Sequence, residues 1–216
     1  MKTFIIIGCH RSGTSLTSML ANKIGVYIGD KLIGPTHYNK YGHFENIEFM
    51  RLHEKWLKEL HSSWHDPPSI ESIKEHIPKF KNEAIEYVNK FKREPLWGWK
   101  DPRNTIFLPV YLEIVENPHV IICLRDSISI AKSLSKRDKF TFEYSKSVVK
   151  KYMEHLEYCK KLIKSNKIPN IEIKFENYFN DGKNEIRKLM KFILGTISEQ
   201  KVEFLIKLID PNAKHF

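Results

Sequence analysis

The fold is decided by the first fifteen residues, which read MKTFIIIGCHRSGTS (residues 1–15). Residues 3–7 form an apolar, largely β-branched run that is typical of a buried strand, and Gly8 ends it. Apolar residues within 16–24 then recur at helical spacing, and Gly25 is placed as a C-terminal cap. Strand, glycine-bounded turn and helix in this order build a phosphate cradle, in which backbone N–H groups and the positive end of the helix converge on an anion.

The composition of the turn distinguishes between two kinds of phosphate site. In a nucleotide-hydrolysing P-loop, G-x-x-x-x-G-K-[ST], a lysine follows the second glycine and reaches the terminal phosphates. The spacing from Gly8 to Gly13 is that of a P-loop, but Thr14 occupies the position of the lysine. The only cation of the turn is Arg11, on the other side of Gly13. Together with the hydroxyl groups around it, this arginine indicates an anion-binding site of a different kind.

Length and charge limit the classes of protein and partner. We expect residues 1–216 to form a single domain, because a chain of 216 residues can bury one sizeable core. The formal net charge of +10 favours anionic partners, which include a nucleotide, an acidic glycan, nucleic acid or a membrane surface. Most of the lysines are expected on solvated helix faces, so the charge alone does not indicate a nucleic-acid partner, and we expect none. No apolar run is long enough for an integral membrane segment.

Cysteine and histidine usage indicates neither a disulfide framework nor a metal site. Cys9, Cys123 and Cys159 lie far apart, with neither disulfide nor metal-ligand spacing, so we expect buried free thiols. The 10 histidines are scattered rather than arranged as an i, i+4 ligand pair with further ligands. Because no signal-peptide pattern is evident either, we expect a cytoplasmic protein without a bound metal.

The hydrophobic pattern predicts strands that alternate with helices. The expected strands are 3–7, 96–100, 119–124 and 171–175. The expected helices are 14–24, 45–61, 70–92 with a disturbance at Pro78, 104–116, 127–137, 142–165, 183–194 and 198–209. This alternation predicts an α/β fold, namely a P-loop-like three-layer fold with a central parallel sheet flanked by helices.

A second candidate phosphate site follows the strand expected at 119–124. Arg125 stands at the carboxyl end of this strand, where open α/β sheets bind their ligands. Ser133 lies eight residues further on, about two turns along the next helix. An arginine can fork onto a phosphate, and a serine hydroxyl can donate to it. Taken alone, the pair is equally consistent with a surface arginine and a helix-filling serine.

The two motifs together resemble those of the sulfotransferases that use 3′-phosphoadenosine 5′-phosphosulfate (PAPS). The segment RSGTS (residues 11–15) is similar to the family's 5′-phosphosulfate loop, and Arg-x7-Ser after a strand is similar to its 3′-phosphate site. The resemblance extends over nearly the whole chain, although the late Arg-Lys-Gly segment of eukaryotic cytosolic members is absent. It implies that PAPS is the donor and that the following residues bind it: Arg11, Ser12, Gly13, Thr14, Ser15, Arg125 and Ser133.

Sulfuryl transfer also needs a base that removes the proton of the acceptor. Like phosphoryl transfer, it moves an electron-poor group in line between two oxygens, so catalysis consists of positioning, charge stabilisation and proton removal. The resemblance implies a base in the loop after the first helix, and Glu45 is our first choice there. The alternative is that Glu45 is a first-turn acid of the helix at 45–61, where it would stabilise the helix dipole. His37 and His43 are reserves.

A second group of charged residues, KDPR (residues 100–103), ends a short predicted strand, so its side chains should emerge at the carboxyl edge of the sheet. In cytosolic members of the family a lysine at this strand end touches the transferring sulfonate, and the base follows two residues later, where this chain has Pro102. The resemblance therefore assigns Lys100 to the sulfonate or bridging oxygens and Arg103 to the acceptor or a donor phosphate. Asp101 is either an alternative base or a residue that orients Lys100 or Arg103, unless the group is simply an ion-paired corner of the fold.

The sequence thus predicts a PAPS-dependent sulfotransferase acting on a hydroxyl or amine of a small-molecule or carbohydrate acceptor, with a glycan among the candidates. The other product is adenosine 3′,5′-bisphosphate, and no metal is required. A P-loop nucleotide or small-molecule kinase is the first alternative, disfavoured by Thr14 and by the lack of a magnesium-binding carboxylate after an apolar strand. A non-catalytic protein that binds an anionic ligand is the second. The acceptor and the oligomeric state stay open, and loops 26–44 and 62–70 are expected to shape the acceptor pocket.

Overall fold

The central sheet consists of parallel strands. The structure is a computed structural model that describes residues 1–91 and 94–211. Within this part of the chain the sheet has the strand order β2-β1-β3-β4. The strands are β1 (Lys2–Ile7), β2 (Leu96–Lys100), β3 (Pro118–Leu124) and β4 (Asn170–Lys174). In the register of the sheet, Ile5 of β1 lies opposite Trp99 of β2 and opposite Val120 of β3.

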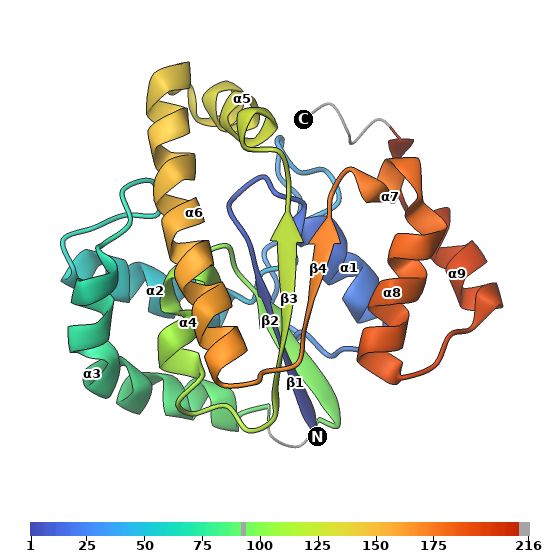
Figure 1. Ribbon diagram of the computed structural model, residues 1–216, viewed down its shortest axis with the longest axis horizontal. Coiled ribbons are helices and arrows are strands. Elements are labelled where there is room, and N and C mark those ends of the chain that lie inside the picture. Colours follow the sequence, from blue (N-terminus) through green and yellow to red (C-terminus); the bar gives the residue numbers. More distant parts are fainter. Residues whose placement is uncertain (92–93, 212–216) are drawn as a thin grey trace.

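Helices connect the strands and cover both faces of the sheet (Figure 1). They are α1 (Thr14–Ile24), α2 (Ile47–Glu59), α3 (Ile70–Asn89), α4 (Asn104–Tyr111), α5 (Ser127–Asp138), α6 (Phe142–Ser165), α7 (Asn177–Asn180), α8 (Gly182–Leu194) and α9 (Glu199–Ile206). The short helix α7 was not predicted from the sequence. The predicted fold class, a central parallel sheet flanked by helices, is confirmed.

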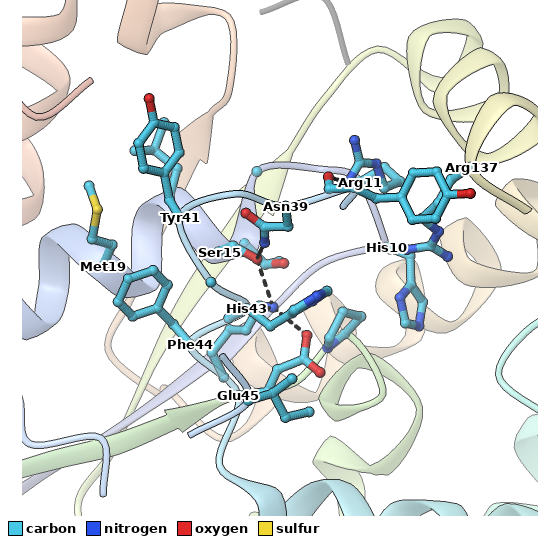
Figure 2. Close-up of a pocket in the computed structure, with 18 of the residues that line it drawn as sticks. His10, Arg11, Ser15, Met19, Asn39, Tyr41, His43, Phe44, Glu45 and Arg137 are labelled. Carbon is cyan, nitrogen blue, oxygen red and sulfur yellow. Dashed lines mark hydrogen bonds and ion pairs between the residues drawn. The ribbon is translucent and has the colours of Figure 1, made fainter. Parts of the chain in front are cut away.

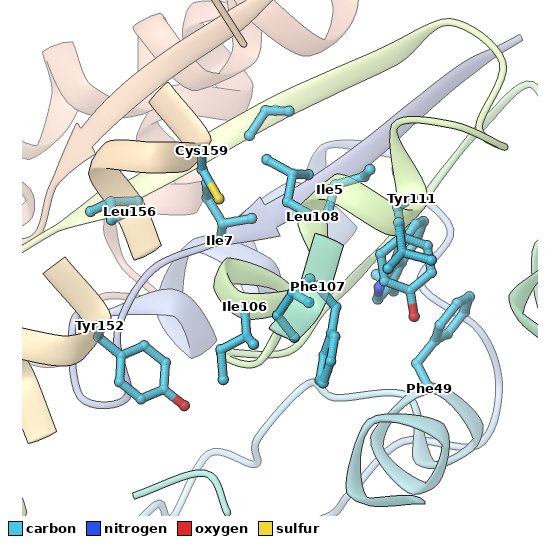
Figure 3. Packing of buried hydrophobic residues seen from close by; sticks show 14 of the residues in the cluster. Ile5, Ile7, Phe49, Ile106, Phe107, Leu108, Tyr111, Tyr152, Leu156 and Cys159 are labelled. Carbon is cyan, nitrogen blue, oxygen red and sulfur yellow. The ribbon is translucent and has the colours of Figure 1, made fainter. Parts of the chain in front are cut away.

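Strand β1 is buried on both faces, which explains why its sequence is apolar throughout. Side chains point alternately to the two faces of a strand. Ile5 and Ile7 therefore lie in the hydrophobic cluster formed with α4 and α6, whereas Phe4 and Ile6 lie in the cluster formed with α1, α8 and α9. Figure 3 shows Ile5 and Ile7 packed within the first of these clusters.

Several helix boundaries differ from the predicted ones, and the interior of α3 is also informative. Pro78 lies inside α3 without ending it, because the apolar face of this helix packs on α4 and outweighs the missing backbone N–H. Residue 92, the predicted end of this helix, lies outside the described residues. Helix α4 ends at Tyr111, earlier than predicted. Helix α2 begins only after Asn46, whose Oδ1 caps it by accepting from the Glu48 N–H at 2.9 Å.

The carboxyl ends of the strands meet at one edge of the sheet, which carries the loops that the sequence singled out. Strand β1 leads into the turn at 8–13, and β2 leads into the corner at 101–103. Strand β3 ends one residue before Arg125, and β4 ends one residue before Phe175. This edge lies at the arrowheads of β3 and β4 in Figure 1. Parallel topology thus brings segments from distant parts of the sequence to one place.

Candidate active site

The turn between β1 and α1 (residues 8–13, the glycine turn) is closed by its own hydrogen bonds. The N–H and the hydroxyl of Ser12 both donate to the carbonyl oxygen of Cys9, at 3.1 and 2.7 Å. The Gly8 N–H donates to Oγ1 of Thr105 at 2.8 Å, which ties the turn to α4. The hydroxyl of Ser12 is therefore used within the turn and shapes it from inside.

Gly13 gives the glycine turn a conformation that other residues adopt only with strain. Its φ is +88°, directly before the first residue of α1. A Cβ at this position would lie 2.4 Å from Cδ2 of Phe175, the residue that follows β4. Because Gly13 has no side chain, the amino end of α1 stays open, and its backbone N–H groups are available to an anion.

A cavity of about 430 Å³ opens at this edge of the sheet, and Figure 2 shows part of its lining. The glycine turn, the loop that contains Glu45, and the charged ends of β2 and β3 form its wall. Of the residues that the sequence predicted for the site, the following line the cavity: Arg11, Gly13, Thr14, Ser15, Glu45, Lys100, Arg103 and Arg125. Ser12, Asp101 and Ser133 do not line it, and each is buried.

Lys100 holds three parts of the site together. Its Nζ lies 2.5 Å from Oε1 of Glu45, and it donates to Oγ of Ser15 at 3.1 Å and to the carbonyl oxygen of His43 at 3.0 Å. Lys100 is 2% exposed and Glu45 is 7% exposed. Figure 2 shows Glu45, His43 and Ser15 gathered around this contact. A buried ion pair requires additional hydrogen bonds, and Ser15 of α1 and the His43 carbonyl oxygen supply them to Lys100.

The place of Glu45 in the chain excludes one of its two interpretations. Helix α2 starts at Ile47, Asn46 is its N-cap, and Glu48 is the acid of its first turn. Glu45 therefore precedes the cap, and its carboxylate contacts Lys100 instead of the helix end. The interpretation of Glu45 as a first-turn helix acid is wrong.

Asp101 is buried among partners that use both of its oxygens. NH1 of Arg103 lies 3.0 and 3.2 Å from them, and the Arg103 backbone N–H donates to Oδ1 at 2.8 Å. Nδ1 of His53 lies 3.2 Å from Oδ2. Burial alone would raise the pKa of Asp101, but Arg103 and His53 hold it well below its usual range. A carboxylate of this kind is a weak base, so the geometry favours the role of orienting Arg103 over that of an alternative base.

The same network fixes Arg103 against α2. NH2 of Arg103 contacts Oε1 of Glu54, and Nε2 of His53 lies 2.7 Å from the hydroxyl of Tyr111. Burial lowers the pKa of Arg103, but the charges of Asp101 and Glu54 raise it in net above its ordinary value. Arg103 therefore remains a cation in the wall of the cavity.

Arg125 and Ser133 both contact Arg11 of the glycine turn. NH1 of Arg125 donates to the Arg11 carbonyl oxygen at 2.9 Å, and its guanidinium lies over the ring of Phe175, 4.5 Å from the centroid. Nε of Arg11 donates to Oγ of Ser133 at 2.8 Å. The RSGTS motif and the Arg-x7-Ser motif, which are far apart in the sequence, are thus in direct contact.

Positive charge accumulates around Arg11. Burial, followed by the charges of Arg137 and Arg125, lowers the pKa of Arg11 to about 10, with Asp138 acting in the opposite direction. Burial also lowers the pKa of Arg125. Burial and neighbouring guanidinium groups thus disfavour the Arg11 cation, and a bound anion would offset this cost.

Several residues of the cavity wall were not predicted from the sequence. Arg137 is one, although it lies one helical turn after Ser133 on α5, and this i, i+4 spacing could have identified it. His10 is another. The loop after α1 also reaches the glycine turn, because Nδ2 of Asn39 donates to Oγ of Ser15 at 3.3 Å and the Tyr38 carbonyl oxygen accepts from NH1 of Arg11 at 3.4 Å. These contacts depend on packing between distant segments.

The three cysteines are buried and free, as expected. Cys9 lies in the hydrophobic cluster on the α4 and α6 side, and burial raises the pKa of its thiol. In residues 1–91 and 94–211, no group of three or more His, Cys, Asp or Glu side chains is placed to hold a metal ion. No helix in this described part is both long and apolar enough to cross a membrane.

Comparison with known proteins identifies the family. The sequence profile of the sulfotransferase family matches residues 3–196, so the chain belongs to this family. A comparison with curated protein sequences found no match.

Solved structures share the fold at low sequence identity. The sulfotransferase domain of the olefin synthase of Synechococcus PCC 7002 aligns with a TM-score of 0.58 and 14% identity, covering 98% of this chain and 82% of that one. Sulfotransferase STF1 of Mycobacterium tuberculosis H37Rv aligns with a TM-score of 0.54 and 11% identity, covering 99% and 73%. Retinol dehydratase, solved with androsterone and the inactive cofactor PAP, aligns with a TM-score of 0.50 and 13% identity, covering 97% and 65%. These similarities show the shared sulfotransferase fold.

Proposed function

We propose that this protein transfers a sulfonate group from PAPS to a hydroxyl or amine of a small-molecule or carbohydrate acceptor and releases adenosine 3′,5′-bisphosphate. The observation that carries the proposal is the position of the buried Lys100–Glu45 pair, which touches Ser15 at the start of α1. A cation and a carboxylate next to a phosphate-type turn are the groups that sulfuryl transfer requires. The family and the PAP complex of retinol dehydratase support PAPS as the donor.

The donor would be held by the two motifs that meet at Arg11. The glycine turn and the amino end of α1 supply backbone N–H groups and a positive dipole for the 5′-phosphosulfate. Arg125 and Ser133 supply a guanidinium and a hydroxyl for the 3′-phosphate, next to Arg11. The burial of Arg11 and the neighbouring charges of Arg137 and Arg125 support an anionic ligand at this position.

Lys100 and Glu45 would have different roles in the reaction: charge stabilisation and proton removal, respectively. The acceptor oxygen or nitrogen forms a bond to sulfur while the bond from sulfur to the 5′-phosphate oxygen breaks, and adenosine 3′,5′-bisphosphate leaves. The proton of the acceptor passes to Glu45, and Lys100 stabilises the charge on the sulfonate or bridging oxygen. Both side chains are buried, which strengthens these interactions relative to water.

Arg103 would act on the acceptor side of the cavity. It lines the cavity while Asp101 and Glu54 hold its guanidinium from behind. Asp101 therefore serves as a positioning residue, since its two oxygens are already engaged by Arg103 and His53.

The proposal is tested by comparing two nucleotides that differ in one group. Adenosine 3′,5′-bisphosphate is expected to bind at least 10-fold more tightly than adenosine 5′-monophosphate, because charge-assisted hydrogen bonds to the 3′-phosphate contribute about 1.5–3 kcal/mol each. In Arg125→Ala this preference should fall to nearly one, whereas Lys132→Ala, which removes an exposed charge from the following helix α5, should keep it. Isothermal titration calorimetry measures the affinity of the wild-type protein and of each variant for both nucleotides. Tighter binding of ATP with magnesium than of adenosine 3′,5′-bisphosphate would contradict the proposal.

A further inference from the structure

At one end of the cavity lie polar side chains that have no role in the proposed binding of the donor or in the proposed proton transfer. Arg137 of α5 and His10 of the glycine turn both contact Trp64, which also lines the cavity. The guanidinium of Arg137 lies over the Trp64 ring, 5.0 Å from its centroid, and the His10 ring centroid is 4.6 Å from that of Trp64. Figure 2 shows Arg137 and His10 together at the end of the cavity opposite Met19. We call these three residues the Arg137 subsite.

The hydrogen-bond donors of the Arg137 subsite are largely unused. Nε of Arg137 is bound to both oxygens of Asp138, at 3.0 and 2.9 Å. The terminal NH1 and NH2 groups make no hydrogen bond to any described residue. Nε2 of His10 is buried and likewise has no hydrogen-bond partner among the residues that the structure describes. Buried polar atoms are normally paired, so Nε2 of His10 indicates a missing ligand or solvent partner. The Arg137 side chain is 18% exposed, so its terminal N–H groups are accessible from the cavity that Arg137 lines.

The charges around the subsite define the ligand more closely. Burial lowers the pKa of His10 well below its ordinary value, and the charges of Arg103 and Arg137 lower it further, so the imidazole is neutral at pH 7. The subsite therefore offers the Arg137 guanidinium, partly balanced by Asp138, beside a neutral imidazole. A planar guanidinium fork matches the two oxygens of a carboxylate, and the balancing Asp138 favours a monoanion over a more highly charged group.

We propose that the acceptor carries a carboxylate, which the terminal N–H groups of Arg137 and the Nε2–H of His10 bind. This inference rests on the proposed function and narrows its acceptor to hydroxy or amino carboxylates, a class that includes acidic sugars. The reacting hydroxyl or amine then faces Glu45, which lines the same cavity. Arg137 is in this view the residue that determines acceptor specificity.

The experiment compares carboxylic acids with their primary amides, which differ in charge but hardly in shape. The probes are D-glucuronic acid, 4-hydroxyphenylacetate and 3-hydroxybutyrate, each with its amide, titrated by calorimetry into protein with and without adenosine 3′,5′-bisphosphate. At least one acid is expected to bind roughly 10-fold or more tightly than its amide. In Arg137→Gln this ratio should fall to about one, and Arg137→Lys should keep part of it. Arg51→Gln, which removes an exposed charge from α2, should keep the full ratio.

Two results would overturn the inference. The first is that no acid binds more tightly than its amide to the wild-type protein. The second is that the preference survives in Arg137→Gln. The thermal midpoint of each variant, measured alongside, separates misfolding from lost recognition, and Arg137→Lys retains a cation if Arg137→Gln does not fold. Because the nucleotide titration is read separately, a protein that fails to bind adenosine 3′,5′-bisphosphate contradicts the proposed function, not the carboxylate subsite.

Discussion

Nε of Arg11 donates a hydrogen bond to Oγ of Ser133 at 2.8 Å, across 122 positions of the sequence. This contact ties the glycine turn after β1 to the helix after β3. It also orients the Arg11 guanidinium, whose pKa is lowered by burial and by the neighbouring arginines. The RSGTS motif and the Arg-x7-Ser motif are therefore in direct contact, and we expect a substitution in either one to change the geometry of the other.

Arg11→Ala is expected to weaken nucleotide binding and turnover together. Arg11 faces charge that the donor carries before the reaction starts, so its loss affects the ground state as well as the transition state. We expect a loss of roughly 10- to 100-fold in affinity for adenosine 3′,5′-bisphosphate, measured by calorimetry. Ser133→Ala, which removes one neutral partner, should cost less. An Arg11→Ala variant with unchanged affinity would show that the glycine turn does not bind the nucleotide.

Glu45→Gln is expected to separate catalysis from binding. The amide keeps the size of the side chain but cannot take a proton, so turnover should fall roughly 10²- to 10⁴-fold while nucleotide affinity is retained. Because the buried Lys100 ammonium loses its carboxylate, the variant should also lose stability, so rates are compared at a temperature at which it is folded. Initial rates of sulfonate transfer from PAPS provide the measurement. Glu48→Gln, in the first turn of α2, is the matched control and should stay active. If Glu45→Gln remains fully active and Asp101→Asn is inactive, the base is Asp101.

Asp101→Asn is expected to destabilise the fold. The substitution leaves the buried Arg103 guanidinium without its main carboxylate and disturbs the contact to His53. Breaking a buried ion pair by removing one partner costs about 3–5 kcal/mol, which urea unfolding can measure. Asp66→Asn, at a side chain that is 61% exposed and paired with Lys151, is the control and should change stability by at most about 1 kcal/mol. Equal stability of both variants would mean that the Asp101 network is not structural.

The stability of the protein should decrease as the pH falls below 7, and His10 should contribute to this decrease. Its pKa in the folded protein is well below 6.5, whereas in the unfolded chain it is ordinary. The unfolded state therefore binds the proton first, so stability is full above the unfolded pKa and is lost as the pH falls through it. His10→Gln should show a smaller loss between pH 7.5 and 5.5 in urea unfolding, with His37→Gln, at an exposed position, as the control. Parallel curves for His10→Gln and wild type would contradict a neutral buried His10.

Alkylation should leave the donor site intact. Cys9 belongs to the glycine turn, but the structure places its side chain in the core cluster. Burial also raises the pKa of its thiol, which suppresses the reactive thiolate. Native protein treated with iodoacetamide should therefore keep its affinity for adenosine 3′,5′-bisphosphate, and all three thiols should react only in urea. Loss of nucleotide binding that accompanies modification of Cys9 in the folded protein would contradict this orientation.

Much of the fold could be predicted because its signals are local. The apolar run before Gly8 and the helical spacing after Thr14 each occupy a short window, and all four expected strands occur close to their predicted positions. The helix that contains Pro78 was also predicted, and its packing on α4 explains why it continues through the proline. The correct position of Glu45 relative to α2 depended on the cap at Asn46.

Residues of the site could be predicted from the sequence only where they belong to a short motif. Arg11 and Arg125 belong to short patterns, whereas His10 and Arg137 meet only because α5 and the glycine turn pack against Trp64. The engagement of Asp101 by His53 also joins positions 48 residues apart. Helical spacing from Ser133 could have indicated Arg137 itself, but these pairings are set by tertiary packing, for which a single sequence contains no local signal.

The contacts of Lys100 link the donor and the base of the proposed reaction. Its ammonium contacts both Oε1 of Glu45 and Oγ of Ser15, so one side chain joins the proposed base to the first turn of α1. A sulfonate bound at Ser15 would therefore share a single cation with the carboxylate that faces the acceptor. In the proposed reaction, the spacing between donor and base is then set by the length of one lysine.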